Sequence, residues 1–260
     1  MSIELFDTHC HLNSGELFES RQRVVADALE AGVSRLITVA CKPDEFGPGL
    51  SLRNLHAGLY VAIGIHPHEA AAVGTADVEA LPGLWRQERV VAAGEMGLDY
   101  HYDFSPRLVQ RQVFERQLEL VRTVGLPVVV HCREAQPEVI DMLLAHGFAG
   151  QRVVFHCFSG TPQEAAEVRA HGWWTSFTGL ITFKNATGPR QAMLDTPVDQ
   201  LMFETDSPYL SPEPVRRMRP NEPRNVAHTV RFAAGVRGES FEELAQRTTR
   251  NAMHFFGISE

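Results

Sequence analysis

Cysteine is scarce in this sequence, and long hydrophobic runs are absent. The chain has four cysteines among 260 residues, too few for the disulfide framework that stabilises small secreted domains. No apolar run approaches the roughly 20 residues that a membrane-spanning helix needs. The first residues lack the basic and apolar regions of a secretory signal. We therefore expect a reducing, cytoplasmic location and no membrane association.

Basic residues are fewer than acidic ones. The chain has 24 Lys and Arg against 32 Asp and Glu, which gives a formal net charge of -8. Proteins that coat duplex nucleic acid rely on a basic surface, so this balance argues against that role. It remains compatible with an enzyme that admits one phosphodiester to a metal site, where two divalent ions would add four positive charges.

No linker rich in Pro, Gly or Ser and no low-complexity tract divides the chain. A hydrophobic fraction of 44% is ample for a sizeable core. Because α/β barrels routinely reach this length as one domain, we expect a single domain over residues 1–260.

Strand-like and helix-like segments alternate along the chain. Short apolar runs predict strands over residues 5–7, 35–40, 60–65, 90–94, 126–130, 152–155, 173–177 and 201–203. Apolar residues at helical spacing predict helices over 20–31, 107–124, 137–146, 226–236 and 240–256, and another after Thr161 as N-cap. Eight such alternations predict an α/β fold of the (β/α)8 TIM-type, with an open doubly wound sheet as the alternative.

Six potential metal ligands follow predicted strands. They are His9, His11, Glu95, His131, His156 and Asp206. The C-terminal ends of the strands form the active face of a (β/α)8 barrel, so we expect these residues to meet in one ring. Four histidines and two carboxylates suit two divalent cations that keep open positions for water and substrate.

The histidines lie beside cysteines, which raises the question of which atom binds metal. His9 and His11 can share one face of an extended segment while Cys10 points away. The same alternation turns the cysteines that follow His131 and His156 towards the surrounding helices. No Cys-x-x-Cys motif occurs, which favours histidine as the ligand. Taken alone, each histidine is better explained as a core or loop residue, so the metal prediction depends on the whole set.

The carboxylates have distinct predicted roles. Glu95 leaves its strand between glycines, and its two oxygens can bridge cations about 3.5–4 Å apart. Asp206 can ligate one ion and accept a proton from the attacking water. Its structural alternative is a turn or N-cap residue before Pro208.

Two further features have weaker signals. Pro67 restricts His66 to an extended conformation, which aims His66 as a donor to a substrate phosphate oxygen; the alternative is a polar loop pair with His68. Four arginines cluster near Asn221–Pro223 and form either a phosphate-steering loop or a solvated basic loop. They are Arg216, Arg217, Arg219 and Arg224. Trp173 and Trp174 are expected to pack in the barrel.

At these residues the chain resembles the TatD family of metal-dependent deoxyribonucleases, within the wider amidohydrolase-type superfamily. The resemblance covers nearly the whole length. It rests on Asp7–His11, Gly64–His68, Gly94–Tyr100, Leu126–Ala135, His156–Gly160, Thr182–Ala186, Glu204–Leu210 and Asn221–Pro223. One departure is Arg217–Pro220, where the family usually has a Gly-Lys pair. Positive charge is kept there, so the departure bears on substrate preference rather than catalysis.

The resemblance implies a distorted (β/α)8 barrel and hydrolysis of DNA, at single strands or 3′ ends, often as a 3′-to-5′ exonuclease. It implies two divalent ions (Mg, Mn or Zn) and no obligate protein partner. One ion would be held by His9, His11, Glu95 and Asp206, and the second by Glu95, His131 and His156.

For such a site we expect Glu95, Asp206 and His66 to be the catalytic residues. A metal-activated water would attack phosphorus in line with the leaving 3′ oxygen, with Asp206 orienting or deprotonating it. The alternatives are hydrolysis of another ester or amide, such as an aminoacyl ester or a lactone, and a non-catalytic nucleic-acid-binding protein on the same fold. The intact ligand set argues against the latter.

Overall fold

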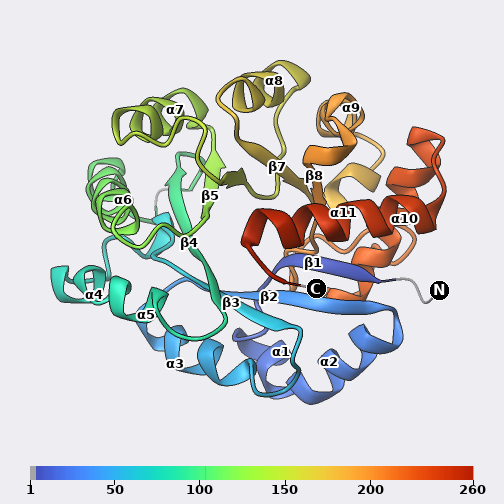
Figure 1. Ribbon diagram of the computed structural model, residues 1–260, viewed down its shortest axis with the longest axis horizontal. Helices are drawn as coiled ribbons and strands as arrows, with labels where there is room; N and C mark the ends of the chain where they lie inside the picture. Colours follow the sequence, from blue (N-terminus) through green and yellow to red (C-terminus); the bar gives the residue numbers. More distant parts are fainter. Residues whose placement is uncertain (1–3, 103, 260) are drawn as a thin grey trace.

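The computed structural model describes residues 4–102 and 104–259. Within them, eight parallel strands form one sheet in sequence order, curled into a barrel with helices outside (Figure 1). The strands are β1 (Leu5–Cys10), β2 (Val33–Ala40), β3 (Leu59–Ile63), β4 (Val90–Asp99), β5 (Val128–Arg133), β6 (Val153–Phe155), β7 (Trp174–Phe177) and β8 (Leu201–Phe203). The predicted α/β barrel is confirmed.

The described helices alternate with these strands. They are α1 (Gly15–Glu19), α2 (Arg21–Glu30), α3 (Pro43–Leu52), α4 (Thr75–Glu79), α5 (Leu81–Trp85), α6 (Arg107–Val121), α7 (Gln136–Ala145), α8 (Pro162–Ala170), α9 (Thr187–Asp195), α10 (Val226–Arg237) and α11 (Phe241–Phe256). Thr161 is the N-cap of α8 as predicted, because its side chain accepts from the Glu164 N–H and the Glu164 carboxylate accepts from the Thr161 N–H. Sequence patterns did not predict α1, α3, α4, α5 and α9.

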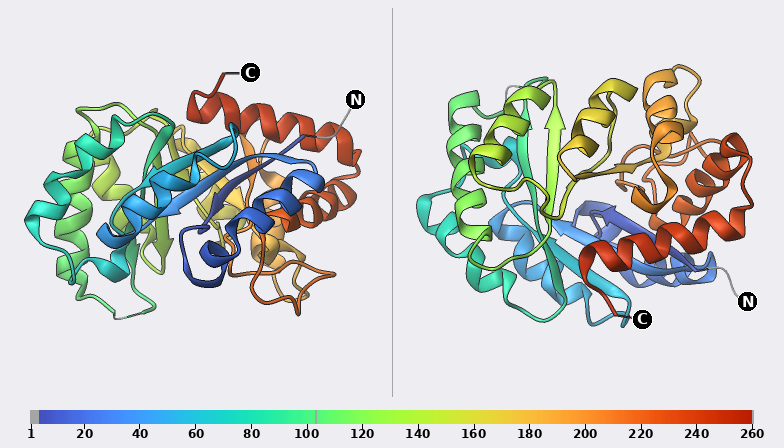
Figure 2. Two further views of the ribbon diagram at one scale, coloured as in Figure 1. Left: turned by 90° about the horizontal axis from the view of Figure 1, so that it is seen from below. Right: turned by 45° about the horizontal axis from the view of Figure 1, so that its top comes forward.

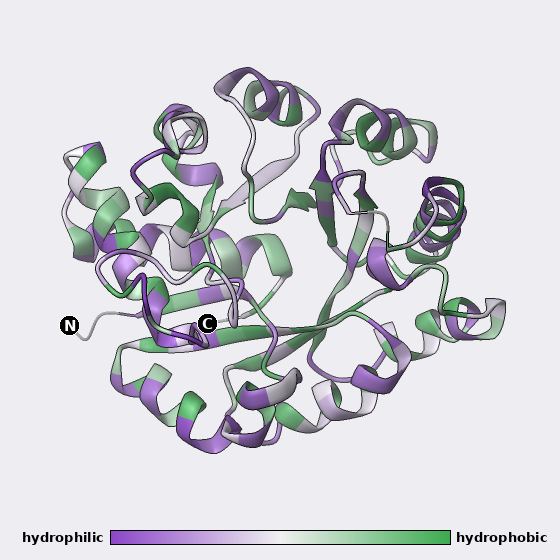
Figure 3. Ribbon diagram, turned by 180° about the vertical axis from the view of Figure 1, so that it is seen from behind, coloured by the Kyte–Doolittle hydropathy of each residue, from purple (hydrophilic) through white to green (hydrophobic). Residues whose placement is uncertain are grey.

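Two hydrophobic cores result from the alternation of strand side chains. The larger lies between the strands and the surrounding helices. The smaller fills the barrel, where Phe6, Ile37 and Val129 from three strands meet Phe255 and Phe256 of α11. Figure 3 shows the strands as largely hydrophobic, whereas the helices have mixed surfaces. Each strand is therefore covered by apolar groups on both faces, as expected for a parallel sheet.

The barrel is nearly closed, with a seam between its first and last strands. There the described ladder is reduced to an isolated bridge between Cys10 and Ser207. Helix α11 lies across the strands near this seam (Figures 1 and 2). Its Asn251 side chain donates to the carbonyl of Leu201 at the start of β8, and its Thr249 hydroxyl donates to the carbonyl of Glu4 before β1. α11 thus covers the N-terminal end of the barrel.

Three strands continue beyond their predicted ends, so His9, Glu95 and His131 lie within strands rather than after them. The predicted third strand ends two residues early, at Ile63. The longest extension is in β4, where Gly97 pairs with His131; a Cβ at Gly97 would overlap the His131 carbonyl oxygen. Glycine there allows β4 and β5 to remain paired past Glu95.

Irregular register coincides with the predicted ligands. Pairing shifts between Asp7 and Cys10 in β1, which includes His9, and between Ala93 and Met96 in β4, which includes Glu95. A register irregularity changes the direction of a strand side chain, and such features are common beside active sites.

Along the described part of the chain, no helix combines the length and apolar character needed to cross a membrane.

Candidate metal centre

The structure brings all six predicted ligands together at the C-terminal end of the barrel. Their potential metal-binding atoms form two overlapping groups, in each of which the atoms lie within 4.8 Å of one another: His9, His11 and Asp206, and His9, Glu95 and His156. His131 contacts the second group through Glu95. Residues separated by almost two hundred positions in the sequence therefore form one cluster.

Glu95 lies at the centre of the cluster, with its oxygens directed to different histidines. Oε2 is 3.3 Å from Nε2 of His9. Oε1 is 2.7 Å from Nδ1 of His131 and 2.7 Å from Nε2 of His156. A carboxylate whose oxygens face two separate sets of nitrogens has the geometry of a bridging ligand.

Asp206 completes the other side of the cluster. Its Oδ1 lies 3.3 Å from Nε2 of His11 and 3.8 Å from Nε2 of His9. The Asp206 backbone N–H donates to the His9 carbonyl at 2.9 Å, which holds the segment after β8 against β1. The Asp206 side chain is 13% exposed, as is that of His11, so Asp206 lies on the accessible side of the cluster.

The donors in the cluster fit divalent cations. Nε2 of His9 and Nε2 of His11 are 3.3 Å apart and face the same carboxylate oxygen. Two neutral imidazole nitrogens at this distance can share only one proton, whereas a cation accepts both lone pairs. Within the described chain, Nδ1 of His9 is buried without a hydrogen-bond partner. Imidazole and carboxylate ligands are compatible with Zn, Mn or Mg.

Hydrogen bonds around the cluster orient its rings. His11 donates from Nδ1 to the Val39 carbonyl at 3.2 Å, which leaves Nε2 facing Asp206. His131 donates from Nε2 to Oδ2 of Asp99 at 2.9 Å, which leaves Nδ1 facing Glu95. Such outer partners fix the tautomer and orientation of metal-binding histidines.

Asp99 and Glu204 are functional candidates to which sequence reasoning gave no role. Glu204 places Oε1 at 3.4 Å from Nδ1 of His156, and its Oε2 accepts from the Ser176 hydroxyl at 2.7 Å. Both carboxylates are buried, with exposures of 0% and 1%. The sequence signal for Glu204 was its position directly after the predicted last strand, whereas Asp99 lies beyond the predicted end of its strand and gave no such signal.

The histidines keep the central carboxylates ionised. Burial raises the pKa of Glu95, but the charge of His156 and hydrogen bonds from the His131 and His156 rings bring that pKa well below its usual value. Burial similarly raises the pKa of Asp206, and the His11 hydrogen bond contributes most to the opposing effect that leaves it lowered. Both groups are therefore charged ligands at neutral pH.

His66 borders the cluster in a form suited to donate a hydrogen bond. Its Nδ1 accepts from the His68 N–H at 3.0 Å, so the neutral ring carries its proton on Nε2. That nitrogen is 3.2 Å from Oε1 of Glu95. Burial lowers the pKa of His66 to about 4, which keeps the ring neutral at pH 7.

The cysteines contribute no ligand to these groups in the described structure. Cys10 directs its thiol to the Ile37 carbonyl, and Cys132 packs against the outer core. Cys157 contacts the Thr178 hydroxyl at 3.6 Å. One cysteine contact with the cluster was not predicted. Cys41 directly follows β2, and its Sγ lies 3.6 Å from Oε2 of Glu95.

Much of the arginine cluster makes local contacts. Arg224 pairs with Glu222 at 2.9 Å, and the Arg216 guanidinium lies 3.4 Å from the centroid of the Phe183 ring. Arg219 donates to carbonyls of its own loop. These contacts favour a loop-stabilising function.

The two tryptophans pack as expected: Trp173 is buried, and Trp174 contacts Phe255.

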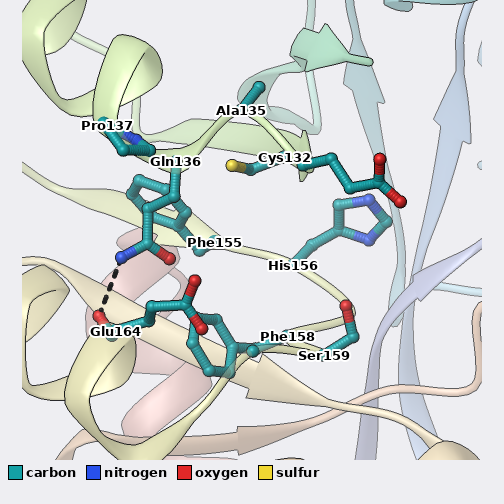
Figure 4. Close-up of a pocket in the computed structure, with 11 residues that line it drawn as sticks. Cys132, Ala135, Gln136, Pro137, Phe155, His156, Phe158, Ser159 and Glu164 are labelled. Atoms are coloured by element: carbon teal, nitrogen blue, oxygen red, sulfur yellow. Dashed lines mark hydrogen bonds between the residues drawn. The ribbon is translucent and has the colours of Figure 1, made fainter. Parts of the chain in front are cut away.

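A cavity of about 320 Å³ adjoins the cluster beside His156. Figure 4 shows its walls, which come from the starts of α7 and α8 and from the segment after β6. Gln136 donates to the Glu164 carbonyl across one side, and Phe155 and Phe158 supply apolar surface. The cavity gives a substrate room for a group next to His156.

Comparisons with known proteins agree with this geometry. A family model described as TatD related DNase matches residues 6–257. The chain is 36% identical over 255 residues to the metal-dependent hydrolase YabD of Bacillus subtilis, covering 98% of this chain and 100% of YabD. It is 32% identical over 259 residues to the 3′-5′ ssDNA/RNA exonuclease TatD of Escherichia coli K12, covering 98% and 100% of the two chains.

A solved structure is also similar over its full length. The crystal structure of YJJV, a TatD homologue from Escherichia coli K12, superposes with a TM-score of 0.93 and 28% sequence identity. The match covers 100% of both chains. The barrel with its seam is therefore a shared architecture.

Proposed function

The chain belongs to the TatD family of metal-dependent hydrolases, and on that basis we propose that it is a 3′-to-5′ exonuclease of single-stranded nucleic acid. The observation that carries the proposal is Glu95, whose oxygens face separate sets of histidines. A relative named as a 3′-5′ ssDNA/RNA exonuclease supports the substrate class and polarity. We take residues 1–260 as one catalytic domain.

The proposed metal centre holds two divalent ions. We assign one ion to His9, His11, Glu95 and Asp206 and the second to Glu95, His131 and His156. Such ions act as Lewis acids and lower the pKa of bound water towards about 7. The chain's contribution is to keep Glu95 and Asp206 ionised and, through outer hydrogen bonds, to direct the lone pairs of His11 and His131 inwards.

Asp206 is the proposed proton acceptor. Its lowered pKa leaves the carboxylate ionised, and its partial exposure lets water approach it. A hydrogen bond to this carboxylate would orient the attacking water towards phosphorus. The Asp206 N–H bond to β1 limits movement of its backbone during the reaction.

His66 is the proposed donor to the substrate. Its Nε2–H is directed to the same side of Glu95 as His131 and His156, and the neutral ring needs no proton from solvent to donate. A donor placed where negative charge develops on a non-bridging oxygen stabilises the transition state more than the ground state. His66 therefore supports phosphodiester chemistry without binding metal.

The deciding experiment is digestion of 5′-labelled single-stranded DNA and RNA by chelated protein reconstituted with Mg, Mn or Zn. We expect a metal-dependent ladder that shortens from the 3′ end and is absent with Glu95→Gln. Metal analysis should accompany each reaction. A protein with two bound metals that cleaves neither nucleic acid would contradict the exonuclease and direct the search to ester and amide substrates.

A further inference from the structure

Two aromatic side chains are exposed beside the metal centre, on the segment that follows β4. Tyr102 is 40% exposed and Phe104 is 67% exposed. Their rings are stacked, with centroids 5.3 Å apart and planes 11° from parallel. Exposed aromatic surface is unfavourable in water, so a paired and exposed arrangement beside a candidate active site indicates a binding surface.

The pair is joined to the metal centre through His68. The edge of the His68 ring contacts Phe104, with centroids 4.8 Å apart and planes at 81°. Nε2 of His68 donates to Oδ2 of Asp99 at 2.9 Å, and the same oxygen accepts from His131. Two side chains, His68 and Asp99, therefore connect the aromatic pair to His131, a proposed metal ligand.

Buried polar groups hold this segment on both sides of the pair. Oδ1 of Asp99 accepts from the Tyr102 N–H at 2.9 Å. After Phe104, the Ser105 hydroxyl donates to the His68 carbonyl at 2.8 Å and accepts from the Ala71 N–H at 3.0 Å. Asp99 and Ser105 are both fully buried. The backbone before the rings is thus fixed to Asp99, which also orients His131, and the backbone after them is fixed to His68 and Ala71.

A positive charge accompanies the aromatic surface. The Arg133 guanidinium lies 4.8 Å from the centroid of the Tyr102 ring. Arg133 ends β5 two residues after His131, and its side chain is exposed. Aromatic faces for the bases and arginine for the backbone are the combination by which proteins hold single-stranded nucleic acid.

We propose that Tyr102 and Phe104 form a stacking platform for one base of the substrate strand near the scissile phosphate. This inference rests on the proposed exonuclease function and adds how the strand is held. Arg133 pairs with a phosphate of the same strand. Because every base has an aromatic face, the platform tolerates any sequence but requires a base.

Oligonucleotides that lack a single base test the platform. Baseless residues are placed one at a time at the first three positions from the 3′ end, and kcat/KM is measured for the wild type, Tyr102→Ala and Phe104→Ala. We expect one baseless position to reduce the wild-type value by about 5- to 150-fold. The alanine variants should show a similar loss on the complete strand and little further loss at that position.

The control and a second readout separate stacking from folding. Leu108→Ala removes a side chain of similar exposure, 64%, from the first turn of α6 and should keep the wild-type pattern. Phe104→Trp should retain the sensitivity to a missing base. With chelated protein, 2-aminopurine at the sensitive position should be quenched by the wild type and not by Phe104→Ala.

The results distinguish the platform from the proposed function. If the wild type degrades complete strands but is insensitive to every missing base, the platform is wrong and the exonuclease stands. The same holds if the alanine variants keep the full sensitivity of the wild type. If the metal-loaded wild type cleaves no nucleic acid and quenches no 2-aminopurine strand, the exonuclease proposal fails and the platform fails with it.

Discussion

Glu95 combines burial with charge, and its two oxygens have different neighbours. Glu95→Gln keeps the size of the side chain but removes its charge. We expect kcat to fall by more than the roughly 10- to 100-fold that follows loss of an outer hydrogen-bond partner. Metal analysis should show less than full occupancy, while circular dichroism remains that of the wild type. The exposed Glu30→Gln is the control; equal activity of the two variants would contradict the bridging assignment.

His66 differs from the ligands because its Nε2 carries a proton in the neutral ring. His66→Ala should therefore retain both metals and lower kcat by about 100- to 1,000-fold, as expected for loss of one transition-state donor. The measurements are metal content and single-turnover rates. His254→Ala, an exposed histidine on α11, serves as the control. Loss of metal from His66→Ala would instead identify His66 as a ligand.

The six ligands could be predicted at the residue scale because each follows an apolar strand, and a barrel brings all strand C-termini to one end. The residues that contact these ligands from outside the set could not be predicted. Asp99 reaches His131 and His68 only because β4 continues five residues beyond its predicted end. Cys41 has no neighbouring histidine in the sequence, and its approach to Glu95 depends on the position of β2. Contacts of this kind depend on register rather than on residue type.

At the scale of elements, β4 depends on glycine for its close approach to β5. Gly97 has a φ of 147°, and a Cβ there would overlap the His131 carbonyl oxygen. Gly97→Ala should destabilise the protein by about 1–3 kcal/mol, the usual cost of forcing strained backbone, and weaken metal binding through His131. Urea unfolding and metal titration measure the two effects. Gly83→Ala, in helix α5 with nothing within 4 Å, should leave metal binding unchanged and should not destabilise the protein.

Element prediction failed mainly where the sequence contains Pro and Gly or where an element is short. Helix α3 includes Gly47, Pro48 and Gly49, residues that normally interrupt a helix. Helices α1, α4 and α5 have five residues each, too few for an apolar period to emerge. By contrast α11, with 16 residues and a Ser240 N-cap, was predicted almost to its ends. Tertiary packing compensates for weak local preference in α3.

For the whole molecule, metal binding should contribute to stability. Ions that bind the folded state alone stabilise it by mass action. At a free metal concentration of 100 Kd, this adds about 2.7 kcal/mol, which corresponds to a rise in Tm of about 5 to 10 °C for a domain of this size. Differential scanning calorimetry of chelated and reconstituted protein measures the shift. Glu95→Gln should show a smaller one, and an equal shift would place the ions outside the cluster.

The seam has a consequence for local motion. His9 and His11 belong to the first strand and its end, whereas Asp206 follows the last strand, so one ion bound by all three would connect the two edges of the sheet where their hydrogen-bonded ladder is sparsest. The Asp206 and His11 amides, which donate across this junction to His9 and Ser207, should exchange with deuterium quickly without metal and slowly with it. Occupancy of the catalytic ion would then govern how often the barrel opens.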